Sequence, residues 1–165
     1  MDSSLEFLAF AAVNNLRAAG LTVATAESCT GGLIAAALTG VPGASAAFRY
    51  GWVTYCNEAK ERELGVPAAL IEEHSVVSEP VVAAMAEHAM RKAGADFALA
   101  VSGNAGPTAA EGEPPVGTVC IALARRGAAR PTHTETIFRP GLNRNDFRTM
   151  VAARALELLA GASHA

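Results

Sequence analysis

The sequence predicts a three-layer α/β/α domain with a mixed, mostly parallel sheet. Segments in which apolar residues recur at helical spacing alternate with short, apolar, β-branched runs, which is typical of a sheet covered by helices on both faces. Near the end of the chain, two strand-like runs are joined by a glycine-containing turn at Arg125–Gly127, which predicts a hairpin and an antiparallel strand. No repeat or linker interrupts residues 1–165, so we expect one domain.

The chain begins with a predicted helix and a buried strand. Apolar residues from Leu5 to Leu16 recur at helical spacing, with Ser3 or Ser4 as the candidate cap and Gly20 as the stop. The run Leu21–Ala26 is short, apolar and β-branched, which predicts a buried strand.

A second helix, strand and short helix follow. Gly31–Gly32 opens an alanine-rich helix that ends at Gly40, and Phe48–Tyr55 has the pattern of a strand. Asn57 is a candidate cap for a short helix that extends through Leu64.

The second half of the chain repeats this alternation. A helix is predicted from Ser78 to Lys92, with an early proline and a terminal glycine as its signals. The remaining predicted elements are the strands Phe97–Val101, Val116–Ala124 and Thr132–Phe138, and a final helix Asp146–Leu159.

Three loops are expected to meet at one edge of the sheet. They are Glu27–Gly32, Tyr55–Lys60 and Ser102–Pro115, and each follows a predicted strand. Because ligands of open α/β sheets bind beyond the carboxyl ends of the strands, we expect these loops to form one cleft.

The composition excludes several classes of protein. With 51% hydrophobic and 18% charged residues, the chain is expected to be globular, and its net charge of −3 with scattered arginines disfavours nucleic-acid binding. No apolar run is long enough to predict a membrane span, and the first residues do not resemble a signal peptide, so we expect a cytoplasmic protein. The three cysteines lack CxxC spacing and the histidines lack ligand spacing, so we expect no metal site.

Ser28 lies at a predicted strand-to-helix turn followed by two glycines. Such a turn presents a hydroxyl to solvent and points helix amides at a developing oxyanion or a phosphate. The alternative is that Ser28 or Thr30 only caps the helix. Cys29 is a rival nucleophile, but we expect its side chain to point into the core.

Lys60 is one of only two lysines and follows the second strand. A lysine desolvated enough to be neutral accepts a proton from a serine without any histidine, and Tyr55 is placed to assist in a proton relay. The alternative is an ordinary solvated lysine on a charged helix face.

Four motifs together resemble those of a known family. They are Ala26–Gly32, Tyr55–Lys60, Ser102–Pro107 and Pro115–Val119. In this order they are similar to the CinA C-terminal domain family, whose single-domain members include nicotinamide mononucleotide deamidases. The resemblance implies an α/β/α domain with about five strands.

The implied activity is a metal-independent and cofactor-independent amidohydrolase in pyridine-nucleotide recycling. Water would replace the carboxamide nitrogen of nicotinamide mononucleotide, giving nicotinate mononucleotide and ammonia. The resemblance further implies Ser28 as nucleophile, Lys60 as base and then acid, and Tyr55 as an assisting group. The implied substrate-binding residues are Thr30, Gly31, Gly32, Asn57, Ser102, Gly103, Arg144 and Arg148, with either Arg144 or Arg148 as the partner of the phosphate. The expected partner is a small nucleotide, within a homo-oligomer.

The third motif departs from the family pattern. Asn104 replaces an isoleucine, Thr108–Ala110 interrupts a glycine run, and Pro114 stands where a lysine is expected. Loss of a lysine beside a phosphate site removes a charge-assisted contact. An amidase for a different substrate, a catalytically silent nucleotide-binding module and a protein-partner domain therefore stay open as alternatives.

Overall fold

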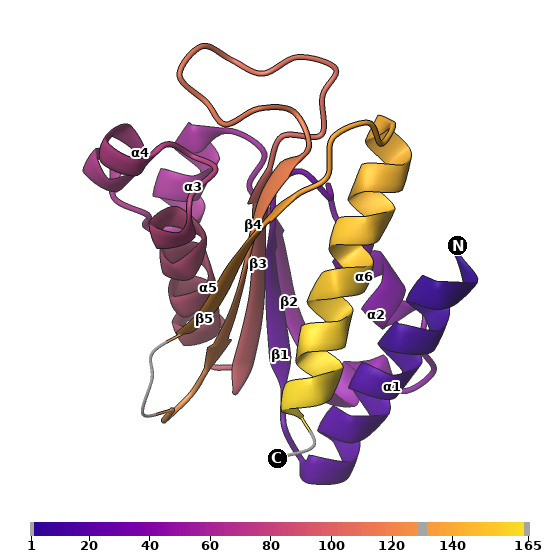
Figure 1. Ribbon diagram of the computed structural model, residues 1–165. Helices are drawn as coiled ribbons and strands as arrows, with labels where there is room; N and C mark the ends of the chain where they lie inside the picture. The colour runs from indigo at the N-terminus through magenta and orange to yellow at the C-terminus, as the bar shows by residue number, and fades with distance from the viewer. Residues whose placement is uncertain (1, 129–131, 164–165) are drawn as a thin grey trace.

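A computed structural model describes residues 2–128 and 132–163, and it contains one five-stranded sheet in the order β2-β1-β3-β4-β5. The strands are β1 (Val23–Glu27), β2 (Phe48–Val53), β3 (Phe97–Gly103), β4 (Thr118–Arg125) and β5 (Thr132–Phe138). The pairings β1–β2 and β1–β3 are parallel, whereas β4 is antiparallel to both β3 and β5. Only β4 therefore runs against the other four strands, and the predicted mixed, mostly parallel sheet is confirmed (Figure 1).

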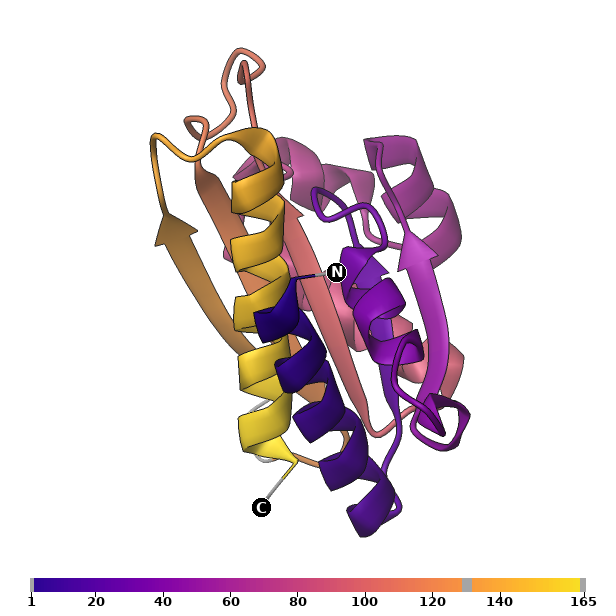
Figure 2. The ribbon, with the colours of Figure 1, turned by 90° about the vertical axis from the view of Figure 1, so that its right-hand side faces the viewer.

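Helices cover both faces of this sheet. They are α1 (Ser3–Ala19), α2 (Leu33–Thr39), α3 (Asn57–Leu64), α4 (Ala68–His74), α5 (Glu79–Ala93) and α6 (Arg144–Ala162), with a short 3₁₀ turn at Ala44–Ala46. One face is covered by α1, α2 and α6, and the other by α5 with α3 and α4 beside it (Figures 1 and 2). The predicted three layers are therefore present.

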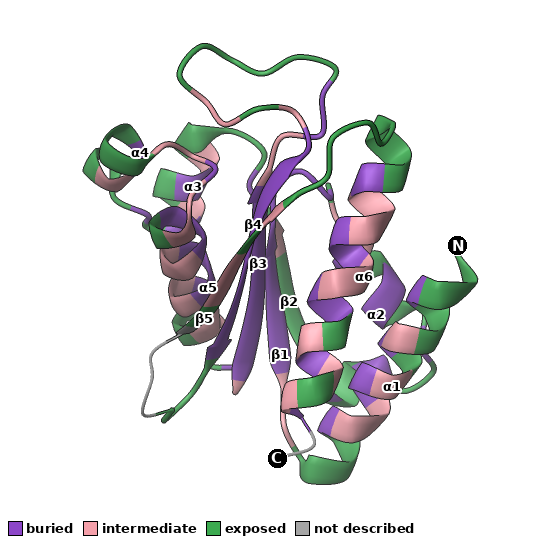
Figure 3. Cartoon of the chain, viewed as in Figure 1, coloured by how far each residue is buried: buried purple, intermediate pink, exposed green. Residues whose placement is uncertain are grey.

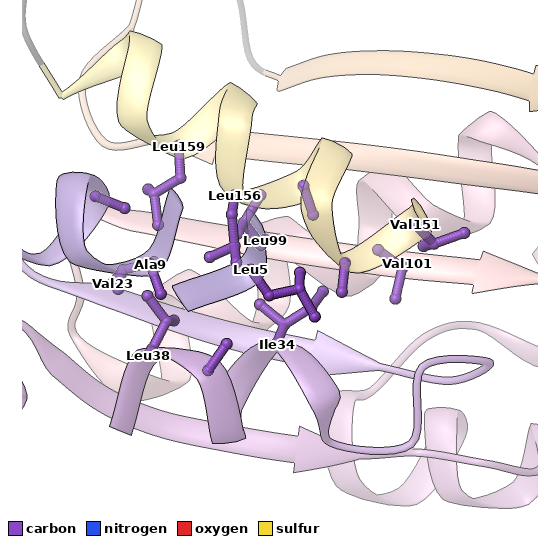
Figure 4. Packing of buried hydrophobic residues seen from close by; sticks show 14 of the residues in the cluster. Leu5, Ala9, Val23, Ile34, Leu38, Leu99, Val101, Val151, Leu156 and Leu159 are labelled. Atoms are coloured by element: carbon purple, nitrogen blue, oxygen red, sulfur yellow. The ribbon is translucent and has the colours of Figure 1, made fainter. Parts of the chain in front are cut away.

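Side chains of the central strands alternate between the two faces of the sheet, so the sheet separates two hydrophobic cores. On β3, Phe97, Leu99 and Val101 face α1, α2 and α6, whereas Ala98 and Ala100 face α5. Figure 4 shows the first core, in which leucine and valine side chains from helices and strands interlock, and Figure 3 shows the central strands buried almost throughout. Small residues on the other face allow α5 to pack closely on the sheet.

The helix ends differ from the sequence expectation in three places. Asp2, rather than Ser3 or Ser4, caps α1, because its carboxylate accepts the Ser4 backbone N–H at 2.9 Å. Cys56, not Asn57, is the N-cap residue of α3, and Asn57 is the first helical residue. Asn143 caps α6, so this helix begins at Arg144, two residues before the predicted start.

Two further elements differ from the prediction. Strand β2 ends at Val53 rather than Tyr55. Helix α4 was not predicted, because it has neither a side-chain N-cap nor a terminal glycine to mark its ends. Residues 129–131, part of the predicted hairpin connection, lie outside the described residues. Among the described residues, no helix is both long and apolar enough to cross a membrane.

Candidate active site

The three predicted loops meet beyond the carboxyl ends of β1, β2 and β3, at the upper edge of the sheet in Figure 1. They enclose a cleft of about 220 Å³. Its lining residues are Ser28, Cys29, Tyr55, Asn57, Lys60, Val76, Val77, Ser102, Gly103, Asn104, Ala105, Gly106, Thr108 and Arg144. Two of these side chains are basic and none is acidic, so the cleft favours an anionic or electron-rich ligand.

Ser28 and Lys60 meet at the floor of this cleft. The Lys60 Nζ atom donates to Ser28 Oγ at 3.1 Å and to the Thr54 carbonyl at 2.7 Å. Lys60 is 1% exposed and is among the largest fully buried side chains. The alternative of a solvated lysine on a charged helix face is therefore wrong.

Burial also changes the ionisation of Lys60. Desolvation lowers the pKa of Lys60 from 10.5 to about 8, because the charged ammonium has lost most of its contact with water. At pH 7 about a tenth of Lys60 is therefore neutral and able to accept the proton of Ser28, and this fraction grows as the pH rises through 8.

Glu27, which the sequence reasoning did not single out, organises the turn formed by residues 28–32, here called the Ser28 turn. Its side chain is 1% exposed and lies at the start of α2. Its carboxylate accepts four hydrogen bonds, from the Thr30 hydroxyl and from the backbone N–H groups of Gly32, Ile34 and Ala35. A carboxylate directly before a helix start is the available sequence signal, since helix N-termini favour anions.

Arg148 holds the same turn from α6. Its Nε donates to the Cys29 carbonyl at 3.1 Å, and its Nη2 donates to the Thr30 carbonyl at 2.7 Å. Gly31 has a φ of +61°, and a Cβ there would lie 3.2 Å from Arg148 Nη2. Glycine is therefore required at position 31 both by the backbone and by the approach of the guanidinium.

These contacts separate four of the expected substrate-binding residues from the cleft. Thr30, Gly31, Gly32 and Arg148 do not line it. The Thr30 hydroxyl and the Gly32 N–H donate to Glu27, and the Gly31 N–H donates to the Ser28 carbonyl. In this structure their donors hold the Ser28 turn together, so we assign them no contact with a ligand.

Cys29 does not offer a reactive thiol. Its side chain is buried, and desolvation raises the pKa of the Cys29 thiol to about 12. Because the thiolate is the nucleophilic form, Ser28 is the better candidate nucleophile in this turn.

Arg144 and Tyr55 lie together at the rim of the cleft. The Arg144 guanidinium donates to the Tyr55 hydroxyl and to the Gly106 carbonyl, both at 2.5 Å. The structure gives Tyr55 Oη no hydrogen bond to Ser28 or Lys60, so it does not place Tyr55 in a relay with them. No carboxylate of the described residues pairs with Arg144, which leaves a cation available to an anionic ligand.

The third loop, residues 104–117, rises above the sheet in Figure 1. Ser102 and Gly103 line the cleft below it, and the buried Ser102 hydroxyl donates to the Val76 carbonyl. The Asn104 amide donates to the Pro114 carbonyl at 3.2 Å, which joins the two stems of the loop. Asn57 also lines the cleft, whereas Pro114 does not.

The described residues contain no group of three His, Cys, Asp or Glu side chains arranged to hold a metal ion. The expectation of a metal-independent reaction stays a prediction.

Comparison with solved structures shows the same fold in bacterial proteins. A competence-damaged protein (CinA) superfamily protein from Klebsiella pneumoniae superposes with a TM-score of 0.90 at 35% identity, covering 96% of this chain and 97% of that one. The competence/damage inducible protein CihA from Agrobacterium tumefaciens gives a TM-score of 0.91 at 38% identity, covering 96% and 94%.

Sequence relatives have greater identity but are much longer. CinA-like proteins from Akkermansia muciniphila and Geobacter sulfurreducens are 53% and 51% identical over 146 and 143 residues, which cover 88% and 87% of this chain. These matches span 34% of each relative, so the chain corresponds to about a third of their length. The family model of the CinA C-terminal domain matches residues 5–162, and the chain therefore belongs to this family.

Proposed function

We propose that this chain hydrolyses a carboxamide through a Ser28–Lys60 pair, and that its substrate is nicotinamide mononucleotide. The observation that carries the proposal is the 3.1 Å contact between Lys60 Nζ and Ser28 Oγ, made by a buried lysine whose pKa is lowered to about 8. A hydroxyl next to a base with this pKa is an activated nucleophile.

In the proposed reaction, Ser28 Oγ attacks the carboxamide carbon while its proton passes to Lys60 Nζ. We assign the oxyanion to the backbone N–H of Cys29, the residue that follows the nucleophile. Lys60 then returns the proton to the nitrogen, ammonia leaves, and an acyl-serine remains. Water attacks the acyl group with Lys60 again as base, releasing the carboxylic acid and restoring Ser28.

The ligand's phosphate is assigned to Arg144 at the exposed rim. The 220 Å³ cleft accommodates the amide end of a ligand, and the remainder extends toward Tyr55 and Arg144. A phosphate would replace the neutral acceptors that Arg144 contacts here with a charged one.

The Arg144→Met variant tests this assignment. We expect KM for nicotinamide mononucleotide to rise about tenfold to a hundredfold with kcat little changed, because a hydrogen bond to a charged group contributes about 1.5–3 kcal/mol. Steady-state ammonia release measures both constants. Nicotinamide riboside, which lacks the phosphate, should show no such increase, and an equal increase with both substrates would contradict the assignment.

The pH profile tests Lys60 as the base. Since neutral Lys60 is the reactive form, kcat/KM should rise with pH below about 8 and level off above it. Initial rates across the neutral and alkaline range measure this midpoint. A profile that is flat through the range would contradict general-base catalysis by Lys60.

The proposal as a whole is tested by incubating the pure protein with nicotinamide mononucleotide and measuring ammonia and nicotinate mononucleotide. Both products should appear in equal amounts. Binding without ammonia release would favour a silent nucleotide-binding module, and neither binding nor release would favour a different amide or a protein-partner domain.

A further inference from the structure

The Ser28 turn is held from two sides by groups of opposite charge. On one side, the buried Glu27 carboxylate accepts the Thr30 hydroxyl and three backbone N–H groups. On the other side, Arg148 of α6 donates to two consecutive carbonyls, those of Cys29 and Thr30. Glu27 thus accepts hydrogen bonds from donors of the Ser28 turn and of the start of α2, whereas Arg148 donates to carbonyl acceptors of the turn.

This arrangement is more elaborate than a helix cap requires. Ordinary N-caps satisfy one or two amides through a side chain that is exposed at the helix end. Here a carboxylate that is 1% exposed receives four donors, and the guanidinium comes from a helix more than a hundred residues later in the sequence. A buried carboxylate is costly unless its charge is fully hydrogen-bonded, so these contacts act as one unit.

The position of the turn explains what the unit does. Ser28 lies between Glu27 and the two carbonyls that Arg148 binds, and its own N–H donates to the Val101 carbonyl of β3. Its backbone is therefore fixed on both sides, and its Oγ atom contacts Lys60 Nζ.

We propose that Glu27 and Arg148 are positioning residues that form a clamp, fixing the Ser28 turn so that Ser28 Oγ stays in contact with Lys60. This inference rests on the proposed role of Ser28 as nucleophile. Neither residue lines the cleft. Arg148 lies one helical turn after Arg144. Arg148 holds the turn that carries the proposed nucleophile, whereas Arg144 is assigned to the phosphate of the ligand.

The test measures how fast a fluorophosphonate modifies Ser28, followed by intact mass, beside kcat and KM for nicotinamide mononucleotide. Glu27→Gln keeps the shape but turns an NH₂ group toward backbone N–H donors. Arg148→Lys keeps the charge but cannot bridge two carbonyls in a fixed fork. Arg154→Lys is the matched control, because Arg154 lies on the same helix and makes a similar two-point contact, with Glu135 at the surface.

We expect both clamp variants to lose about a hundredfold in the rate of modification and in kcat, as for a misplaced reacting group, with KM nearly unchanged. Arg154→Lys should match the wild type. Thermal unfolding identifies the variants that are folded, and Arg148→Lys, which leaves the buried carboxylate intact, decides the question if Glu27→Gln does not fold.

Three results would overturn the inference. Wild-type rates of modification in folded clamp variants would show that the turn does not need them. A higher KM with unchanged modification in Arg148→Lys would assign Arg148 to the substrate. Failure of the wild type to be modified at Ser28 would refute the proposed nucleophile itself, and the clamp with it.

Discussion

Ser28→Ala should abolish amide hydrolysis while the protein stays folded. Removing an activated serine nucleophile lowers kcat by about 10⁴-fold or more, since no other group forms the acyl intermediate. The side chain is 8% exposed and loses one hydroxyl, with its hydrogen bond to Lys60, so the stability cost should be about 1 kcal/mol. Ammonia release and thermal unfolding measure the two effects separately.

Cys29→Ala is the matched control for Ser28→Ala, since it removes the neighbouring candidate nucleophile from the same turn. It should retain most of the activity, because a thiol with a pKa near 12 is protonated and the backbone N–H is kept. The Ser28 hypothesis fails if Ser28→Ala retains activity within about tenfold of the wild type, or if Cys29→Ala is the inactive variant.

Lys60→Met should have the second-largest effect on activity. Methionine has a similar length but accepts no proton, so kcat should fall about 10²–10⁴-fold, as expected for loss of a positioned general base. The small residual rate should no longer rise with pH below about 8. A residual rate that keeps the wild-type pH midpoint would assign that midpoint to another group.

The same variant should change how stability depends on pH. Between about pH 8 and 10.5, the unfolded chain keeps the lysine proton that the folded chain has lost, so the free energy of unfolding of the wild type rises with pH. This contribution amounts to about 3 kcal/mol across that interval. Lys60→Met lacks it, so any stability advantage of the variant at neutral pH should shrink as the pH rises. Denaturant unfolding at several pH values measures the difference, and parallel curves would show that Lys60 is not desolvated.

The sequence predicted the layers and strands because their signals are local. The buried runs around Ala24 and Leu99 have few polar residues, and the helices with clear caps or terminal glycines have strong periodicity. The sequence did not predict α4, and it placed the end of β2 two residues late, because short elements and strand ends depend on tertiary contacts.

The sequence predicted several of the residues that line the candidate site, but not the contacts that hold the site together. Because loops converge beyond the carboxyl ends of parallel strands, the sequence predicted that Ser28 and Lys60 lie close together. It did not predict the burial of Lys60, because the segment Glu58–Arg62 has the charge pattern of a solvated helix face. The contacts of Arg148 with Cys29 and Thr30 span 119 and 118 positions, so no local pattern predicts them. Glu27 contacts residues three to eight positions away, and its place directly before a helix start is a local signal of that role.

The late position of α6 in the sequence has a consequence for the stage of folding at which the Ser28 turn becomes fixed. Ser28 and Lys60 are both synthesised in the first half of the chain, but Arg144 and Arg148 follow only with the last helix of the domain. Until that helix docks beside α1 and α2, a nascent chain holds a serine and a lysine without the guanidinium that fixes the turn. On the proposed roles of Ser28 and Arg148, we expect incomplete chains to be inactive until α6 has docked and Arg148 has bound the Ser28 turn.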